Sequence, residues 1–450
     1  MVIPGWCWRH RRTEGAAVER EALIFVGSCD LAGIVRGKGF PAAAQAQRLH
    51  QGVGLTHSNI MMSAFGPIYD TPYGTLGDLM LVPDPTTYVE VEFDLGDTER
   101  FYLGDILLLS REHWNCCPRH FLRRALQALE AEAGLGIVAA FEQEFVYTGV
   151  EHREGATYSL DAWRRQGSYG EHVMAALRSA GLEPDSFLPE YGPRQYEMTV
   201  SPTGGLRGAD EAVIAREMAR AVAQRHGHRA VFAPILDPDG IGNGTHIHFS
   251  LRDTADQPVM YDAGKPWRMG AAGEQFCAGI LDHLPLLTAV TAPSVASYYR
   301  LQPNRWAPTW ANIGMQDRGA ALRICPIFDE PASRHFNVEY RVADATACPY
   351  LALGAVVWAG LDGIKRKLKL PEFTGKSFWD MSETERQAAG AKPLPRSLSE
   401  SLNLLTASET ARGWFGDELF ECYLRFKRSE MQAVDGMTPA QICARYAEIY

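Results

Sequence analysis

Two short segments place groups that could bind a metal ion two residues apart. Glu142 and Glu144 do so in FEQEFV, and His246 and His248 do so in NGTHIHFSL. Because successive side chains of a strand point to opposite faces, each pair would share one face. Such a face could also be an ordinary solvated surface. The choice depends on whether other polar strands converge on the same place.

Two further segments follow the same pattern. Glu339 and Arg341 share a face in FNVEYRV, and Glu190 and Glu197 flank a Gly-Pro turn in LPEYGPRQYEMTV. A single glutamate on a strand is usually solvated, but several carboxylates among apolar neighbours need a counter-charge if they are buried. A divalent cation supplies one. Oxygen-rich sites with an imidazole suit Mg²⁺ or Mn²⁺ better than Zn²⁺.

A second set of polar residues is basic. Five arginines lie among apolar residues in the later part of the chain: Arg300, Arg305, Arg318, Arg323 and Arg341. Guanidinium groups in such surroundings favour planar recognition of carboxylate or phosphate. For any one of them alone, a solvated surface position is the simpler interpretation.

The elements that would position these residues fall into two parts. The first hundred or so residues are β-rich: LIFVGSCDLAGIVRGK predicts two strands, and TYVEVEFDL alternates with period two. RHFLRRALQALEAEAG predicts a helix that ends at Gly134. We place a domain boundary near residue 110, beyond which strands and helices interleave. From Leu394 the chain reads as helices.

Composition limits the possible classes of protein. The 450 residues suit two or three domains, and 46% hydrophobic and 22% charged residues are ordinary for a folded protein. A net charge of −10 argues against binding to nucleic acid or to an anionic membrane. Nine scattered cysteines without a C-x-x-C pair predict no disulfide framework. The basic N-terminus lacks an apolar run, and Tyr350–Leu361 is too short to span a bilayer, so we expect a cytoplasmic enzyme.

In chain order, these motifs resemble those of the glutamine synthetase family. FEQEF is similar to the family's E-x-E metal strand, EYGPRQYEM to its second acidic pair, and NGTHIHFSL to its N-G-(S/T)-G-x-H-x-H-x-S-L segment. RLQPNRWAP, ALRICP and VEYRVADATACPYLALGAVVWAGLDGI follow at family spacings, and KPLPRSLSESLNLL and YLRFKRSE resemble the C-terminal helices. The resemblance covers nearly the whole chain.

The resemblance implies an α+β fold with two domains. Residues 1–110 would form a small N-terminal β-grasp domain. Residues 111–450 would form the catalytic domain, in which a curved antiparallel sheet makes half a barrel. It also implies a homo-oligomer of stacked hexameric rings, a dodecamer, with active sites between neighbouring subunits.

The resemblance also assigns metal ligands by motif position. The metal near the glutamate would be held by Glu144, Glu190 and Glu197. The metal that bridges the nucleotide phosphates would be held by Glu142, His246 and Glu339.

The remaining roles concern the two substrates. L-Glutamate would be bound by Glu144, Asn243, Gly244, His246, Arg300 and Arg341. ATP would be bound by Asp185, His248, Ser250, Arg323 and Arg334. Arg318, Arg323 and Arg341 would assist phosphoryl transfer, in which a carboxylate attacks the γ-phosphate and two anions must meet.

The sequence departs from the family where ammonia would enter. The family's aspartate in the N-terminal domain, supplied by the adjacent subunit, aligns with Thr56 or His57, and the loop glutamate is Trp306. Ammonium needs a negative pocket and a base, whereas an indole offers an apolar wall for a carbon-bearing amine. An aromatic amine would suit it, and an alkyl amine or polyamine could sit on the ring face. Alternatively, Trp306 is loop packing and another acid serves.

Two smaller departures concern the nucleotide side and the acidic hairpin. A family glycine between the acidic pair is Arg194, and a nucleotide-side arginine is Asn337, for which Arg334 could compensate. No tyrosine matches the adenylylation site of some bacterial members.

These observations predict an ATP-dependent ligase that joins L-glutamate to an organic amine, with an aromatic amine as one candidate. The alternatives are a true glutamine synthetase, a relative that has lost catalysis, and a ligase with a different acid substrate.

Overall fold

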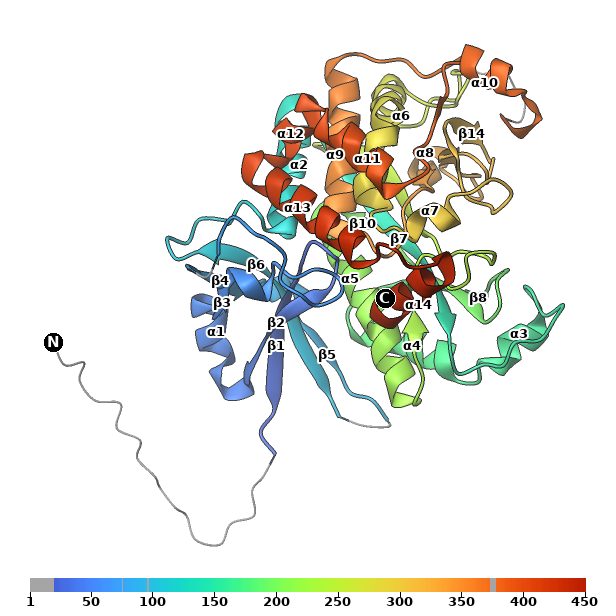
Figure 1. The fold of residues 1–450 in the computed structure, drawn as a ribbon. Coiled ribbons are helices and arrows are strands. Elements are labelled where there is room, and N and C mark those ends of the chain that lie inside the picture. Colours follow the sequence, from blue (N-terminus) through green and yellow to red (C-terminus); the bar gives the residue numbers. More distant parts are fainter. Residues whose placement is uncertain (1–19, 75, 95–96, 373–377) are drawn as a thin grey trace, which may run out of the picture.

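The computed structural model describes residues 20–74, 76–94, 97–372 and 378–450 (Figure 1). Its N-terminal part is a six-stranded sheet in the order β2-β1-β6-β4-β3, with β5 also paired to β6. The strands are β1 (Leu23–Cys29), β2 (Val35–Pro41), β3 (Val53–Thr56), β4 (Asp78–Pro83), β5 (Val89–Val91) and β6 (Glu99–Leu108). All pairs are antiparallel except β1 with β6. A short helix, α1 (Gln45–Gln51), precedes β3.

A second sheet of nine strands forms the centre of the larger part. Its order is β14-β15-β16-β12-β7-β9-β8, and β10 and β11 both pair with β7. The strands are β7 (Leu135–Tyr147), β8 (Pro184–Pro189), β9 (Gln195–Val200), β10 (Thr203–Gly204), β11 (Ala230–Val231), β12 (Thr245–Asp253), β14 (Ile313–Met315), β15 (Leu322–Ile324) and β16 (Val338–Tyr340). The sheet is antiparallel apart from the β14–β15 pair. Beside it, β13 (Trp310–Ala311) pairs with β17 (Lys392–Pro393).

Helices cover this sheet and form much of the core. The long ones are α2 (Pro118–Ala133), α5 (Gly205–Arg225), α6 (Ala271–Thr291), α9 (Pro349–Lys365) and α13 (Asp417–Ala433). The shorter ones are α3 (Leu160–Arg165), α4 (Tyr169–Ser179), α7 (Ser297–Arg300), α8 (Ala332–His335), α10 (Glu383–Ala388), α11 (Leu398–Thr406), α12 (Glu409–Phe415) and α14 (Pro439–Ile449). In Figure 1, α6 and α9 lie side by side. Their backbones touch at Gly279 and Gly363, where an added Cβ would lie within 3 Å of the other helix.

The alternation expected from the sequence is present in β7 and β12. It directs the apolar side chains of these strands into the core and their polar side chains to the opposite face. Phe141 and Phe145 on β7, and Ile247 and Phe249 on β12, are at most 3% exposed and belong to the apolar core. Glu142, Glu144, His246 and His248 alternate with them and therefore point to the opposite face. The two strands supply both an apolar layer and a polar one.

Arg119 joins the two parts of the chain through a buried network. Its side chain is 1% exposed, and it donates to Asp210 of α5 through two nitrogens, each 2.9 Å from a carboxylate oxygen. It also donates to Asp84 at 2.7 Å and to Asp105 at 3.0 Å, both in the N-terminal part. A single guanidinium thus binds three carboxylates across the boundary.

Several sequence predictions can be compared with these elements. α2 ends at Gly134, which has φ +64 as a left-handed C-cap requires, so that prediction is confirmed. The predicted strands of the first segment are β1 and β2, but in TYVEVEFDL only β5, three residues long, forms. The predicted boundary at residue 110 falls between β6 and α2. The apolar segment Tyr350–Leu361 lies inside the buried helix α9.

The remaining predictions concern cysteines and membranes. The eight cysteines in the described part are buried free thiols, as the absence of a disulfide pattern predicted. Within the same part of the chain, no helix is both long and apolar enough to cross a membrane.

Candidate active site

Sheet register brings the acidic and imidazole residues together. His246 lies opposite Glu142, and Glu144 lies opposite Glu197. On the next strand pair, His248 lies opposite Glu339. Four neighbouring strands, β9, β7, β12 and β16, therefore present their polar side chains in one continuous patch, and Glu190 follows the end of β8 beside it. We call this set the acidic cluster (Glu142, Glu144, Glu190, Glu197, His246, His248 and Glu339).

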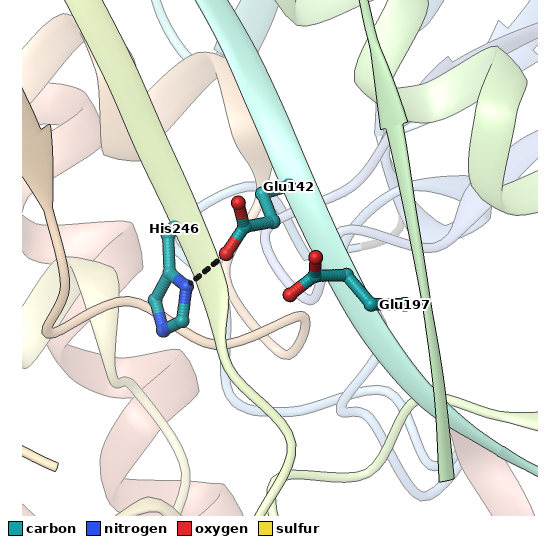
Figure 2. Close-up of side chains that lie close together, drawn as sticks. All are labelled: Glu142, Glu197 and His246. Atoms are coloured by element: carbon teal, nitrogen blue, oxygen red, sulfur yellow. Dashed lines mark hydrogen bonds and ion pairs between the residues drawn. The ribbon is translucent and has the colours of Figure 1, made fainter. Parts of the chain in front are cut away.

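One group of possible metal ligands within it is Glu142, Glu197 and His246, whose donor atoms lie within 4.8 Å of one another. Figure 2 shows the three side chains pointing toward one another, with a hydrogen bond of 2.7 Å between His246 Nδ1 and Glu142 Oε1. Glu197 and His246 are buried, at 8% and 4% exposed, and Glu142 is partly buried.

A second group shares Glu142 and adds His248 and Glu339. Glu339 is 1% exposed and receives hydrogen bonds from Arg323 at 2.7 Å and from Arg341. Burial alone would raise the pKa of Glu339, but His246 and Arg341 hold it below its usual value. Glu339 is therefore an ionised carboxylate between two guanidinium groups and the imidazoles.

The charge balance at the other end of the cluster is different. Burial, and then the charges of Glu142 and Glu144, raise the pKa of Glu197 well above its usual value. Burial and Glu144 likewise raise the pKa of Glu190. Crowded carboxylates lack a counter-charge here, and a divalent cation would provide it. Oxygen donors with one or two imidazoles fit Mg²⁺ or Mn²⁺.

The structure groups the predicted metal ligands partly as expected. His246 Nδ1 lies 3.3 Å from Glu339 Oε1 as well as 2.7 Å from Glu142, so His246 reaches both other members of the predicted nucleotide-side trio. In the glutamate-side trio, Glu144 and Glu197 are register partners, and Glu190 lies at the end of β8. Which residues share an ion remains a prediction.

The residues predicted to bind glutamate surround the start of β12. Gly244 donates its backbone N–H to Glu144 Oε2 at 2.7 Å, and an added Cβ would lie 2.5 Å from His246 Nε2 and 2.7 Å from an Arg300 nitrogen. Arg300 is 4% exposed and donates to the carbonyls of Val342 and Arg341. Only glycine at position 244 lets the side chains of His246 and Arg300 lie this close to the backbone.

Gln195, which the sequence did not single out, ties this region together. It is 3% exposed, and its Nε2 donates to Asn243 Oδ1 at 2.9 Å and to Gly242 O at 2.8 Å, with Glu144 Oε2 at 3.3 Å. The Asn243 amide in turn donates to Ala233 O at 2.8 Å. The Asn243 side chain is thus already hydrogen-bonded on both sides.

Residues predicted to meet ATP are spread from the cluster to the surface. Ser250 follows His248 along β12 and is partly buried, and Arg323 lies on β15 beside Glu339. Asp185 on β8 is exposed and accepts from Thr199 at 3.1 Å, and Arg334 on α8 is exposed.

Arg318 and Tyr158 lie near the Glu190 end of the cluster. Arg318 is exposed. Burial raises the pKa of Tyr158, and the positive charge of Arg318 partly opposes this rise. The Tyr158 hydroxyl donates to Glu190 Oε2 at 3.0 Å, and Tyr158 has φ +54. No periodic pattern in the sequence marks this loop tyrosine.

The loop that carries Trp306 is held from both sides. Arg305 donates to the carbonyls of Pro238 at 2.5 Å, Tyr299 at 3.1 Å and Gly240 at 3.3 Å. Trp306 itself is 66% exposed and has φ +56, a conformation that costs a non-glycine residue roughly 1–2 kcal/mol. Loop packing does not bury the indole.

Thr56 and His57 belong to the other sheet. Thr56 ends β3 and forms a capping box with Asn59. His57 stacks on Tyr73 with ring centroids 4.2 Å apart, and burial lowers its pKa. Within the described ranges, no hydrogen bond or ring contact joins either residue to Trp306. Their place in the amine pocket, contributed by a neighbouring subunit, stays a prediction.

Comparison with known proteins agrees with this architecture. Residues 115–446 match the family model "Glutamine synthetase, catalytic domain", and residues 9–106 match "Glutamine synthetase N-terminal domain". A solved structure described as a novel glutamine synthase homolog superposes with a TM-score of 0.89 at 37% identity and covers 97% of this chain and 100% of its own.

Named relatives are of two kinds. The gamma-glutamylpolyamine synthetase of Streptomyces coelicolor is 32% identical over 96% of this chain and 94% of its own, and a glutamate–isopropylamine ligase of a Pseudomonas species is 29% identical over 83% and 82%. A glutamine synthetase of Pyrococcus furiosus is 30% identical over 91% and 90%.

These matches confirm the predicted two-domain α+β fold and the enzyme class, an ATP-dependent carboxylate–amine ligase. With the acidic cluster on the central sheet and both domain models matched along the chain, the protein belongs to the glutamine synthetase family.

Proposed function

We propose that this enzyme joins the side-chain carboxylate of L-glutamate to an organic amine through γ-glutamyl phosphate, at the expense of ATP. The observation that carries the proposal is the exposed indole of Trp306 on an anchored loop, where the resemblance expects a glutamate. The amine substrate would be either an aromatic or an aliphatic amine.

The first half of the reaction brings two anions together. Arg323 and Arg341 flank Glu339, and each has an Nε atom without a hydrogen-bond partner in the described part of the chain. These donors suit phosphate oxygens in the transition state, where charge is spread over the transferred group. Divalent ions held by the acidic cluster would neutralise the phosphates when bound.

Glutamate would lie at the other end of the cluster. Glu144 accepts from Gly244, and Arg300 lies directly behind Gly244. Such a pocket combines a carboxylate for an α-ammonium group with a guanidinium donor for a carboxylate. The roles of Asn243, Arg300 and Arg341 in glutamate binding are part of the proposal.

The second half depends on the amine. An organic amine gains contact with the Trp306 ring by stacking or by a cation–π interaction. The relatives named for polyamine and isopropylamine ligation support an organic acceptor. The glutamine synthetase relative supports the alternative, in which ammonia is the acceptor and Glu190 with Tyr158 replaces the missing acids.

The testing experiment measures phosphate release with ATP, Mg²⁺ and L-glutamate against ammonium, methylamine, ethanolamine, putrescine and aniline, with mass detection of the γ-glutamyl amide. We expect turnover with at least one organic amine at a kcat/KM at least tenfold above that for ammonium. Preference for ammonium would refute the proposal and make the protein a glutamine synthetase. The Trp306→Glu variant should shift preference toward ammonium.

A further inference from the structure

The ring of His248 is fixed on its Nδ1 side by Asn337. Asn337 Oδ1 lies 3.0 Å from His248 Nδ1, and Asn337 Nδ2 donates to His335 O at 3.1 Å. Because the His335 carbonyl can only accept, the amide nitrogen of Asn337 faces it, and the amide oxygen faces His248. His248 Nδ1 therefore carries a proton, which it donates to Asn337.

Cys325 lies near the same nitrogen but does not change this assignment. Its sulfur is 3.7 Å from His248 Nδ1, farther than the Asn337 oxygen, and its thiol has Arg323 O as an acceptor at 3.9 Å. A thiol is also a weak donor. The shorter contact to Asn337 decides the tautomer.

The other nitrogen of His248 faces two carboxylates. Nε2 lies 3.4 Å from Glu142 Oε2 and 4.0 Å from Glu339 Oε1, and it has no hydrogen-bond partner in the described part of the chain. A divalent ion that replaces a proton at Nε2 would meet the ring's lone pair and two carboxylates at this place. Two ligands that each lie about 2.1 Å from an ion can be up to about 4.2 Å apart. Nε2 is therefore close enough to each carboxylate to share one cation with it, and the donor atoms of all three residues lie within 4.8 Å of one another.

We infer that His248 Nε2 is a metal ligand together with Glu142 and Glu339, and that Asn337 is the positioning residue that frees it. The resemblance assigned His248 to ATP and gave no metal role to position 337. If the ion that His248 binds also binds the ATP phosphates, His248 is both a metal ligand and a residue close to ATP. The inference concerns the ion site alone and does not depend on which amine is used.

A nitrogen ligand has a consequence for metal choice. Mg²⁺ prefers oxygen ligands, whereas first-row transition ions gain more from imidazole. We therefore expect the full-length protein to bind Mn²⁺ more tightly than Mg²⁺ at this site, and to lose most of that preference when His248 is replaced.

The test is Mn²⁺ binding to the full-length protein without ATP or amine, measured by electron paramagnetic resonance, with the directly bound nitrogens counted from their hyperfine couplings. His248→Gln should remove one nitrogen and weaken one site by about 10–100-fold. Asn337→Leu should weaken the same site by about tenfold. Asn337→Asp keeps an acceptor for Nδ1 and should retain the nitrogen count.

The matched control is His172→Gln, because His172 pairs with His226 at 2.9 Å, outside the cluster. It should leave Mn²⁺ binding unchanged. An unchanged nitrogen count and affinity in His248→Gln would overturn the ligand assignment. Wild-type behaviour of Asn337→Leu would overturn the role of Asn337. If His248→Gln does not fold, the two Asn337 variants decide by the same spectrum.

Discussion

Replacing Trp306 by alanine and by glycine separates the function of its ring from the strain of its backbone. Both variants remove the indole, so both lose the same contact with an amine. They differ in the backbone, because position 306 has φ +56, which glycine adopts freely and alanine does not. One pair of variants therefore tests two statements about this loop.

The magnitudes follow from general values. An aromatic or cationic amine on the ring gains roughly 0.5–2 kcal/mol, so kcat/KM for that amine should fall by a factor of roughly 2–30 in both variants. The left-handed backbone at position 306 destabilises the alanine variant by roughly 1–2 kcal/mol. The unfolded chain of the glycine variant has more conformational freedom, which cancels roughly 0.4–1 kcal/mol of that difference. The glycine variant should be more stable than the alanine variant by about 1 kcal/mol.

The assays are amine kinetics at saturating ATP and glutamate, and urea unfolding of the two variants under identical conditions. Equal losses of kcat/KM with a higher urea midpoint for glycine would support the reasoning. Wild-type amine kinetics in both variants would refute the assignment of Trp306 to the amine pocket. A large kinetic difference between alanine and glycine would show that loop conformation, and not the ring, controls the amine.

Three other predictions concern the network, the site and pH. Arg119→Met should lower the free energy of unfolding by about 3–5 kcal/mol, because it leaves buried carboxylates without the guanidinium that pairs with them. A loss below about 1 kcal/mol in a denaturant titration would contradict this prediction. Gly244→Ala should reduce kcat/KM for glutamate by about a hundredfold or more, because its Cβ would collide with His246 and Arg300. The control is Gly136→Ala on the same sheet, which should keep activity because a Cβ there meets nothing within 4 Å. Burial, and then the charge of His113, lower the pKa of His120 to about 4. Since the unfolded chain then binds this proton more readily, stability should fall as pH drops from about 6.5 toward 4, and His120→Gln should flatten that part of the curve in pH-dependent unfolding.

The sequence predicted the parts of the site that depend on local period. FEQEF and THIHF alternate, so the shared faces of Glu142 with Glu144 and of His246 with His248 followed from strand geometry alone. The apolar residues between them identified the core in the same step. Helix α2 was equally local, because its end required only a glycine after an amphipathic run.

Other parts depend on contacts that no local pattern encodes. The position of Tyr158 against Glu190 depends on a loop with a left-handed residue, and the anchoring of Trp306 depends on three carbonyls from two other segments. The hydrogen bonds of Gln195 join three segments that are distant in sequence. The predicted meeting of Thr56 and His57 with the amine would need a contact between two subunits, which no pattern within one sequence encodes.

The alternation of β7 and β12 also affects how faithfully the chain folds. If either strand paired one residue out of register, Glu142 or His246 would enter the apolar layer, and Phe141 or Ile247 would face water. Each carboxylate buried in that layer without a partner would cost several kcal/mol. The residues that perform the chemistry therefore also make misaligned sheets unstable, and apolar replacements that relieve charge crowding would weaken this protection against misfolding.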